Sequence, residues 1–311
     1  MFVPMEVITD IHKFTPIPCA ATVGSFDGVH LGHCSMLEEL RAKAAERGLP
    51  VMVVTFARHP RLLFGTVNEP FLLSSNDEKT ALLESLGVDY CVLLDFDASM
   101  ASMTAERFMG EVLAKQLGVK LLCVGYDHRF GKPLAGEGFE QYAEYGKALG
   151  MELFKALPYV AGDVAVSSSK VRRALAGGDI ALANSLLGHD YSFAGTVVHG
   201  AGIGRSLGFP TANILLHDDM KLLPADGVYD VSVSCMGSNY KGVMNIGVKP
   251  TIGENLVRTV EVHVIGFSGD IYDKEIVVFP VRRLRGEMGF ESVDALRRQI
   301  EADVELVKRG I

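Results

Sequence analysis

The sequence lacks the features that mark membrane proteins and nucleic-acid-binding proteins. No uninterrupted apolar run approaches the ~20 residues that a membrane helix needs, although the mean hydropathy is +0.22. The first residues, MFVPMEVITDIHKF, have no basic end followed by an apolar core, so we expect no signal peptide. Acidic residues outnumber basic ones, 38 to 30, and the net charge of −8 offers no positive field to a phosphate backbone. We therefore expect neither a membrane protein nor a general nucleic-acid-binding protein.

Cysteine is scarce and widely spaced in the sequence. The five residues are an odd number and form no CxxC pair: Cys19, Cys34, Cys91, Cys123 and Cys235. This pattern excludes a disulfide framework and argues against a zinc site built from thiolates. Free thiols at scattered positions fit a reducing compartment, so we expect a cytoplasmic protein.

The chain has an ordinary globular composition with an excess of glycine. Its 311 residues correspond to about two domains. Its 48% hydrophobic and 22% charged residues lie far from the composition of disordered chains. The 33 glycines make up about a tenth of the chain, above the usual ~7%. Since no repeat explains them, they direct attention to places where the backbone comes close to a ligand.

The first half alternates short apolar runs with amphipathic segments. The apolar runs lie at residues 19–24, 51–56, 91–96, 121–125 and 151–157. The helix-like segments between them lie at 37–47, 77–86 and 105–117. In the second of these, Lys79 and Leu83 belong to one predicted buried face. Buried strands separated by helices predict a doubly wound parallel α/β sheet, which binds ligands at the carboxyl ends of its strands.

After Gly188 the pattern changes to short strands separated by Gly, Asn, Asp and Pro turns. These strands lie at residues 193–198, 227–235, 240–247, 259–267 and 275–281. Because no long helix comes between them, we expect an antiparallel β-barrel or sandwich, closed by an amphipathic helix at about 291–308. The predicted domains are therefore residues 1–187 and 188–311.

The segment GSFDGVHLGH, residues 24–33, directly follows the first predicted strand. If His30 opens a helix, His33 lies one turn further and both imidazoles face the same side. Glycines in this segment let backbone N–H groups at the helix start approach a phosphate chain. Two imidazoles with these donors suit stabilisation of charge on a reacting phosphorus. A zinc pair or two surface histidines are the alternatives, and zinc needs further ligands that no conventional spacing provides.

This segment resembles the HxGH signature of the nucleotidyltransferase superfamily. More narrowly, it is similar to the adenylyltransferase module of prokaryotic bifunctional riboflavin kinase/FAD synthetases. Three further segments share the resemblance: VVTFARHPRLLF (53–64), VGYDHRFGK (124–132) and VSSSKVRRAL (166–175). Three positions depart from the residues usual in that family: Ser25, Ala57-Arg58 and His128. His128 stands where the family usually has Phe, so it changes the packing against flavin or adenine that the resemblance implies.

The resemblance implies a set of catalytic and ATP-binding residues in the first domain. His30 and His33 are implied to stabilise the developing charge. The residues implied to bind ATP or its phosphates are Gly24, Phe26, Asp27, Gly28, Gly32, Asp127, Ser168 and Arg172. On chemistry alone, Asp127 is also compatible with a turn or cap aspartate. Likewise, Ser168 and Arg172 are compatible with a plain helix N-cap beside a solvated arginine, or with a polyphosphate clamp.

The block GTVVHGAGIGRSLGFPTANI, residues 195–214, combines a strand, a glycine-dense loop and an extended segment. Main-chain N–H groups of such a loop can form an anion-binding nest, although glycines alone more often mark a structural hairpin loop. Thr211 and Asn213 alternate by two and so point to the same side of an extended segment. A hydroxyl and an amide oxygen there can help to hold Mg²⁺ whose other ligands are phosphates and water.

This block resembles the riboflavin kinase signature GxGRxLGFPTAN. The resemblance continues through residues 227–229, 242–253, 260–276 and 284–300. It implies that Thr211 and Asn213 hold magnesium and phosphate and that Glu261 is the catalytic base; without it, Glu261 would be a solvent-facing strand residue. The residues implied to bind ATP are Gly200, Gly202, Gly204, Arg205, Gly208 and Pro210. A basic cluster after the last strand is interpreted as mostly a surface feature, with a position near the end that binds the flavin as the alternative: Arg282, Arg283 and Arg285.

Together the resemblances cover nearly the whole chain and imply a bifunctional enzyme of flavin cofactor synthesis. The implied partners are small molecules. ATP, Mg²⁺ and riboflavin meet in the second domain to give FMN, and a second ATP meets FMN in the first domain to give FAD and pyrophosphate. Three alternatives stay open: a chain with one active module, a non-catalytic flavin-binding or regulatory protein, and an oxidoreductase that uses flavin as a cofactor.

Overall fold

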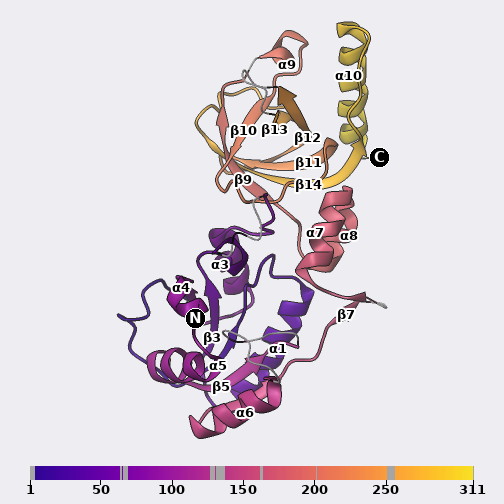
Figure 1. Cartoon of the computed structure of the whole chain (residues 1–311). Coiled ribbons are helices and arrows are strands. Elements are labelled where there is room, and N and C mark those ends of the chain that lie inside the picture. Colours follow the sequence, from indigo (N-terminus) through magenta and orange to yellow (C-terminus); the bar gives the residue numbers. More distant parts are fainter. Residues whose placement is uncertain are drawn as a thin grey trace. The chain divides into compact units, whose positions relative to one another are not determined.

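The protein consists of two compact units (Figure 1). The structure is a computed structural model and describes residues 4–63, 65, 69–126, 130, 137–161, 164–200, 202–250 and 256–310. Unit 1 comprises residues 1–69 and 74–167, and unit 2 comprises residues 70–73 and 168–311. Unit 2 therefore includes a short segment from the first half of the sequence.

Unit 1 contains a six-stranded parallel sheet in the order β1-β4-β3-β2-β5-β6. Its strands are β1 (Glu6–Ile8), β2 (Cys19–Val23), β3 (Val51–Phe56), β4 (Tyr90–Leu94), β5 (Val119–Val124) and β6 (Glu152–Lys155). The predicted parallel α/β sheet is confirmed, and each predicted apolar run contains a strand. The edge strand β1 was not predicted, because only its last residue is buried. A small antiparallel pair, β7 (Val160–Ala161) and β8 (Val164–Ala165), follows the sheet.

Helices cover both faces of this sheet, because successive residues of a strand point to opposite sides. In β2, Ala20 and Ala21 belong to different core clusters. The helices that pack on the Ala21 side are α5 (Ala105–Arg107), the π-helix η1 (Phe108–Gln116) and α6 (Phe139–Ala148). Those on the opposite side are α1 (Leu31–Ala45) and α3 (Asn76–Ser85). Two single-turn helices are α2 (Pro60–Leu63) and α4 (Ala98–Ala101). The helix predicted at 105–117 is thus mostly π-helical, a difference in hydrogen bonding that apolar spacing does not reveal.

The start of α3 is fixed by local sequence. Ser75 is its N-cap: the Ser75 hydroxyl accepts the Glu78 N–H at 3.2 Å, and the Glu78 carboxylate accepts the Ser75 N–H at 2.9 Å. This capping box satisfies two otherwise unpaired backbone donors. The predicted buried face of the helix is confirmed, since Lys79 and Leu83 are both buried.

Unit 2 contains a closed antiparallel barrel in the order β10-β13-β12-β11-β14-β9. Its strands are β9 (Phe193–Val198), β10 (Ala212–Leu216), β11 (Gly227–Cys235), β12 (Ser238–Pro250), β13 (Leu256–Val264) and β14 (Glu275–Arg285). Pairing of β9 with β10 closes the ring. Of the two predicted possibilities, barrel and sandwich, the barrel is therefore the one observed.

Four helices belong to unit 2: α7 (Ser168–Gly177), α8 (Ile180–Leu187), α9 (Ile203–Ser206) and α10 (Val293–Arg309). The predicted closing helix is confirmed as α10. It begins at the N-cap Ser292, whose hydroxyl accepts the Ala295 N–H at 3.1 Å, and ends at Gly310 with φ 69°. Val304 and Val307 of α10 are buried in an apolar cluster with the barrel.

The segment 70–73 is bound along residues 220–222 of unit 2. The N–H groups of Phe71 and Leu72 donate to the Met220 carbonyl at 2.9 and 2.8 Å, and the Leu222 N–H donates to the Leu72 carbonyl at 2.8 Å. The buried Lys221 adds a bond from Nζ to the Leu73 carbonyl at 2.7 Å. Contacts also group α7 and α8 with this unit, whereas the strand pattern placed the change of fold near residue 188. A change of pattern marks where strands begin, and it does not reveal which unit a preceding helix packs on.

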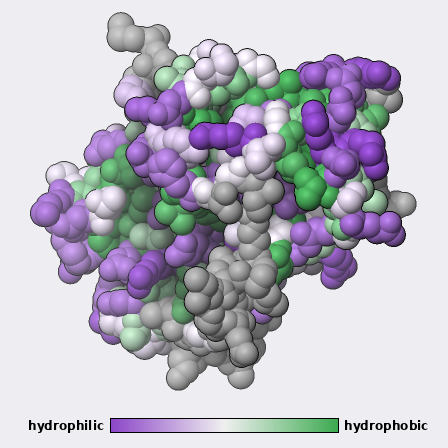
Figure 2. Space-filling model, turned by 90° about the horizontal axis from the view of Figure 1, so that it is seen from above, coloured by the Kyte–Doolittle hydropathy of each residue, from purple (hydrophilic) through white to green (hydrophobic). Residues whose placement is uncertain are grey.

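The surface seen in Figure 2 is mixed, with hydrophilic side chains lying between the hydrophobic ones. Among the helices of the described residues, none is long and apolar enough to cross a membrane.

Gly118 provides a test of how tightly unit 1 is packed. It follows η1 and has φ 81°, and a Cβ there would clash with the Ile17 carbonyl. Gly118→Ala should lower the free energy of unfolding of unit 1 by roughly 2–4 kcal/mol, since backbone strain and overpacking add. Urea unfolding followed by circular dichroism measures this.

Gly48 is the matched control for that substitution. It also has positive φ, 62°, but a Cβ there would meet nothing within 4 Å. Gly48→Ala should therefore cost only about 1 kcal/mol, from the backbone alone. Equal losses for the two variants would contradict the packing argument.

Candidate active sites

The predicted signature loop lies where the strand order of the unit 1 sheet reverses. From β2 the sheet continues to β3 on one side and to β5 on the other. Such a switch point opens a crevice at the carboxyl ends of the strands. Gly24 directly follows β2, and its N–H donates to the Val54 carbonyl of β3 at 3.0 Å. The chain therefore enters the loop at the place where doubly wound sheets bind ligands.

Two residues of the loop have a backbone conformation that non-glycine residues rarely adopt. Phe26 has φ 48° and Val29 has φ 38°. Each such residue costs of the order of 1–3 kcal/mol and persists only where its surroundings hold it. Both side chains are buried in an apolar cluster with Leu37 of α1 and Leu83 of α3. Packing thus holds the loop in one strained shape.

Ser74 holds the centre of this loop. Its N–H donates to Asp27 Oδ1 at 3.1 Å, and its Oγ accepts the Gly28 N–H at 3.0 Å. Asp27 is only 3% exposed. Through its carboxylate, this predicted ATP-binding residue therefore fixes the shape of the loop.

Lys79 is a buried cation near the same loop, and sequence reasoning assigned it only to a packed helix face. Its exposed fraction is 6%, and its Nζ donates to the Phe56 carbonyl at the end of β3 at 3.1 Å. Burial lowers the pKa of Lys79, while attraction to Asp27 and Cys91 opposes that shift. A lysine on the apolar face of an amphipathic helix was the signal that pointed to it.

His30 and His33 lie one helical turn apart, as predicted. His30 is the N-cap of α1, and the His33 N–H donates to the His30 carbonyl at 2.7 Å. The two rings stack with centroids 3.7 Å apart and planes inclined by 15°. A Cβ on Gly32 would approach the His30 ring to 3.1 Å, so glycine leaves room for this stack. Both imidazoles face the same side, and their catalytic role stays a prediction.

The surroundings of His33 keep its ring uncharged. Burial and, secondly, the neighbouring His30 lower the pKa of His33 well below 6.5. Within the part of the chain that the structure describes, His33 Nδ1 has no hydrogen-bond partner. A neutral imidazole has one N–H donor and one acceptor nitrogen, so the ring is equipped to hydrogen-bond a ligand without carrying charge.

Of the other residues predicted for this site, one lies outside the described residues and two belong to unit 2. Asp127 lies outside the described residues. Ser168 is the first residue of α7 and belongs to unit 2. Arg172, on the same helix, donates from Nε to the Phe71 carbonyl at 2.7 Å, and its guanidinium lies 5.3 Å from the centroid of the Phe71 ring. A role of these residues in binding ATP stays a prediction.

In unit 2, three polar side chains form a row across adjacent strands of the barrel. On β13, Glu261 is the cross-strand partner of Asn213 on β10 and of Asn245 on β12. Directly opposed residues share one face of a sheet, with Cβ atoms about 4.5–5.5 Å apart. Sequence reasoning named Asn213 and Glu261 but missed Asn245, because the pairing of distant strands is not visible in the spacing of one segment.

Two contacts tie the segment before β10 to β13. Thr211 Oγ1 donates to Glu261 Oε2 at 3.3 Å. The Pro210 carbonyl lies 2.8 Å from His263 Nδ1, and because a carbonyl only accepts, the imidazole donates from that nitrogen. Thr211, predicted to hold metal, therefore lies beside the predicted base. His263 is a further residue that sequence reasoning missed.

The glycine loop leaves space for these side chains. A Cβ on Gly200 would collide with the amide of Asn213, and one on Gly204 would collide with the Phe209 carbonyl. Two further glycines have left-handed backbone: Gly202 with φ 72° and Gly208 with φ 89°. The predicted close approach of backbone in this loop is thus to the chain's own polar side chains, and an anion-binding role stays a prediction.

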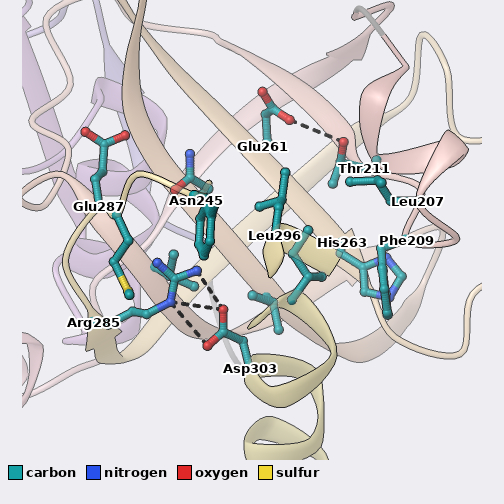
Figure 3. Close-up of a pocket in the computed structure, with 16 residues that line it drawn as sticks. Leu207, Phe209, Thr211, Asn245, Glu261, His263, Arg285, Glu287, Leu296 and Asp303 are labelled. Carbon is teal, nitrogen blue, oxygen red and sulfur yellow. Dashed lines mark hydrogen bonds and ion pairs between the residues drawn. The ribbon is translucent and has the colours of Figure 1, made fainter. Parts of the chain in front are cut away.

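Two cavities lie beside this loop. One of about 340 Å³ is lined by Glu261 and Asn245 and also by Phe290, Leu296 and Ile300 (Figure 3). A second, of about 440 Å³, is lined by the predicted ATP-binding residues Arg205 and Pro210. Thr211 lines both cavities. Such volumes are typical of sites for small molecules.

Arg285 lies at the end of the first cavity that α10 borders, away from Glu261 (Figure 3). Its guanidinium pairs with Asp303 at 2.8 Å, and the two side chains are 18% and 3% exposed. Within the basic cluster, which was interpreted as mostly a surface feature, Arg285 is the less exposed member because it pairs with a residue of the helix that follows β14. The neighbouring Arg282 does lie near the surface: its side chain is 40% exposed and pairs with Asp230 at 3.2 Å.

The ring of His33 provides a direct test of the first site. Its NMR signal, assigned by its loss in His33→Asn, should still report a mostly neutral ring at pH 6.5, because burial and His30 both oppose protonation. A depressed folded-state pKa means that this group stabilises the fold above about pH 6.5 and loses that contribution as the pH falls. Removing the ring with His30→Ala should raise the pKa of His33 only in part, since burial is the larger cause. A ring of His33 that titrates at or above 6.5 would contradict the structure.

Comparison with known proteins agrees with this division into two sites. A family model described as FAD synthetase matches residues 13–170, and one described as riboflavin kinase matches residues 187–311. A crystal structure of a Streptococcus pneumoniae protein, named there a macrolide-efflux protein, is 30% identical with a TM-score of 0.86; the match covers 98% of this chain and 99% of that one.

Curated relatives match along almost their whole length. The bifunctional riboflavin kinase/FMN adenylyltransferase of Escherichia coli K12 is 40% identical over 303 residues, covering 96% of each chain. The protein of the same name from Haemophilus influenzae is 38% identical over 307 residues, covering 98% of each chain. The chain therefore belongs to the bifunctional riboflavin kinase/FMN adenylyltransferase family.

Proposed function

We propose that the chain makes FMN and FAD in two ATP-dependent steps. Residues 188–311 phosphorylate riboflavin to FMN, and residues 1–187 join FMN to AMP from a second ATP, giving FAD and pyrophosphate. Each family model covers one of these ranges in large part, which supports this division of labour.

The observation that carries the kinase step is that two cavities share Thr211 as a lining residue. The cavity with Arg205 and Pro210 receives ATP, and the cavity with Glu261 and the apolar wall of α10 receives the flavin. A phosphoryl group passes directly from ATP to the acceptor hydroxyl, so the donor and acceptor sites have to adjoin.

Glu261 is the general base of this step. Its carboxylate accepts the proton of the ribityl 5′-hydroxyl as that oxygen bonds to the γ-phosphorus of ATP, and the bond from this phosphorus to the bridging oxygen breaks to leave ADP. The Thr211 hydroxyl, 3.3 Å from Glu261 Oε2, orients the carboxylate. The uncharged amides of Asn213 and Asn245 flank this carboxylate on the neighbouring strands.

Thr211 and Asn213 fit a magnesium ion held mainly by the nucleotide. Both offer neutral hard oxygen atoms, and Mg²⁺ commonly takes its remaining ligands from substrate phosphates and water. Within the described ranges, no group of three His, Cys, Asp or Glu side chains is placed to hold a metal by itself. The ion, when bound with ATP, neutralises charge that develops on the phosphates.

The adenylyl transfer step uses the loop at the start of α1. An oxygen of the FMN phosphate attacks the α-phosphorus of ATP, and the bond from that phosphorus to the β-phosphate oxygen breaks to release pyrophosphate. His30 and His33 stabilise the charge that develops, while Asp127, Ser168 and Arg172 hold the nucleotide and the leaving pyrophosphate. No covalent enzyme intermediate is needed, because the substrate supplies the nucleophile.

A cytoplasmic location is consistent with the state of the cysteines. Those of the described residues are all free. Burial raises the pKa of Cys19 and of Cys123 to about 12 and that of Cys91 to about 11, so these thiols stay protonated at neutral pH.

The test of the whole proposal is one incubation. The protein is mixed with riboflavin, ATP and MgCl₂, and riboflavin, FMN and FAD are resolved by chromatography. FMN without FAD would refute the adenylyltransferase half, and no ATP-dependent conversion would favour a non-catalytic flavin-binding protein.

Single substitutions should separate the two steps. Glu261→Gln should slow FMN formation by roughly 10²-fold or more, because the base is lost, and leave the conversion of FMN to FAD unchanged. His30→Ala should do the reverse. Each variant is the control for the other, and a folded variant that loses both steps would refute independent sites.

Gly200→Ala should impair the kinase without unfolding it. The three atoms nearest to the new Cβ all belong to the amide of Asn213, a flexible side chain that can turn aside at little cost in stability. The displaced amide should raise the KM for MgATP several-fold in FMN formation, an effect of the order expected for one lost hydrogen bond. Gly237→Ala is the control, because nothing lies within 4 Å of a Cβ there. An unchanged KM would argue against a nucleotide role for Asn213.

A further inference from the structure

Helix α10 carries a carboxylate within its apolar face. Leu296, Ile300, Val304 and Val307 recur at helical spacing on one side of the helix. Asp303 lies in the same stripe and is 2% exposed. Burying a carboxylate is costly unless it is paired and hydrogen-bonded, so this position calls for a specific partner.

Arg285, the last residue of β14, is that partner. Its NH2 and Nε groups donate to Asp303 Oδ2 at 2.8 and 3.1 Å, while Gln299 Nε2 donates to Asp303 Oδ1 at 2.9 Å. The guanidinium also donates from NH1 to the Gly286 carbonyl at 3.1 Å and lies 5.9 Å from the centroid of the Phe290 ring. One side chain thus joins the end of the barrel, the connection that follows it and α10.

The ion pair is not what attaches α10 to the barrel. Val304 and Val307 pack against Val228 and Val243 independently of it. Along α10, Leu296 and Ile300 line the cavity and precede Asp303, while the buried Val304 and Val307 follow it. The ion pair, marked by dashed lines in Figure 3, therefore lies between these two groups along the helix. A planar guanidinium that binds a carboxylate through two nitrogens fixes direction as well as distance, whereas apolar packing alone allows the helix to shift.

Resting on the proposed kinase function, we propose that Arg285 and Asp303 are positioning residues for riboflavin. They hold the apolar wall, Phe290, Leu296 and Ile300, at the distance from Glu261 at which the flavin ring fills the cavity and its ribityl hydroxyl reaches the carboxylate. Neither residue touches the reacting atoms. The pair therefore acts on riboflavin binding and leaves ATP binding and FMN adenylylation alone.

Asp303→Asn tests this, with Asp230→Asn as the matched control. Asp230 pairs with Arg282 of the same strand β14 but does not line the cavity. Riboflavin affinity is measured by quenching of flavin fluorescence, and KM and kcat are measured for FMN formation. Asp303→Asn should raise the Kd and KM for riboflavin by roughly tenfold or more with the KM for ATP and the rate of FAD formation from FMN unchanged. Asp230→Asn should change none of these.

A merely structural role predicts another result. If losing the pair only unfolded part of the population, the apparent kcat would fall while the KM for riboflavin stayed constant, and that outcome would overturn the proposal. A wild-type protein that forms no FMN would instead refute the kinase function itself, so the two failures are distinguishable.

The double variant Arg285→Met with Asp303→Leu provides a second test of the proposal if Asp303→Asn does not fold. It removes both charges together, so no buried charge is left unpaired. The protein should still convert FMN to FAD and still unfold cooperatively, yet bind riboflavin more weakly than the wild type. Wild-type riboflavin affinity in this variant would show that packing alone positions the wall and would overturn the proposal.

Discussion

The position of the Glu261 side chain depends on one constraint, which is that β13 pairs with two neighbouring strands at once. Because β10 and β12 both oppose it, a slip of one residue would turn Glu261 to the other face of the sheet and break both rows of hydrogen bonds. Closure of the barrel removes free edges, so no strand can shift without disturbing the ring. The row of polar residues and the position of Thr211 beside Glu261 both follow from that register.

In unit 1 the positions of the predicted catalytic residues are fixed in a different way. The loop that carries them leaves the sheet after β2, so strand pairing does not set its shape. Instead, buried side chains hold Phe26 and Val29 in strained backbone, and Ser74 bonds Asp27 and Gly28. Strand pairing in unit 2 and buried packing in unit 1 thus each fix the position of the proposed catalytic groups before a substrate arrives, which is the condition for electrostatic stabilisation of a transition state.

Local features of this protein were predictable from the sequence, and long-range partnerships were not. The strands of the parallel sheet are buried on both faces and so read as apolar runs, and one helical turn sets the stacking of His30 on His33. The pairing of Asn245 with Glu261 depends on strand register, and that of Arg285 with Asp303 depends on how a helix docks. The spacing of residues within one segment reveals neither of these pairs. An acidic residue within the apolar stripe of a helix, such as Asp303, does indicate that a partner exists.

The ribosome makes residues 70–73 about 150 residues before residues 220–222, with which they form hydrogen bonds. At the usual pace of roughly 5–20 residues per second, that delay is about 7–30 s. During this interval the sheet of unit 1 can complete itself, while Leu72 has no strand beside it. Cleaving the chain once between residues 167 and 168 would therefore leave residues 70–73, which pack with unit 2, on the fragment that contains unit 1. The two units are therefore joined by more than one connection along the chain, because residues 70–73 of unit 2 lie within the sequence of unit 1.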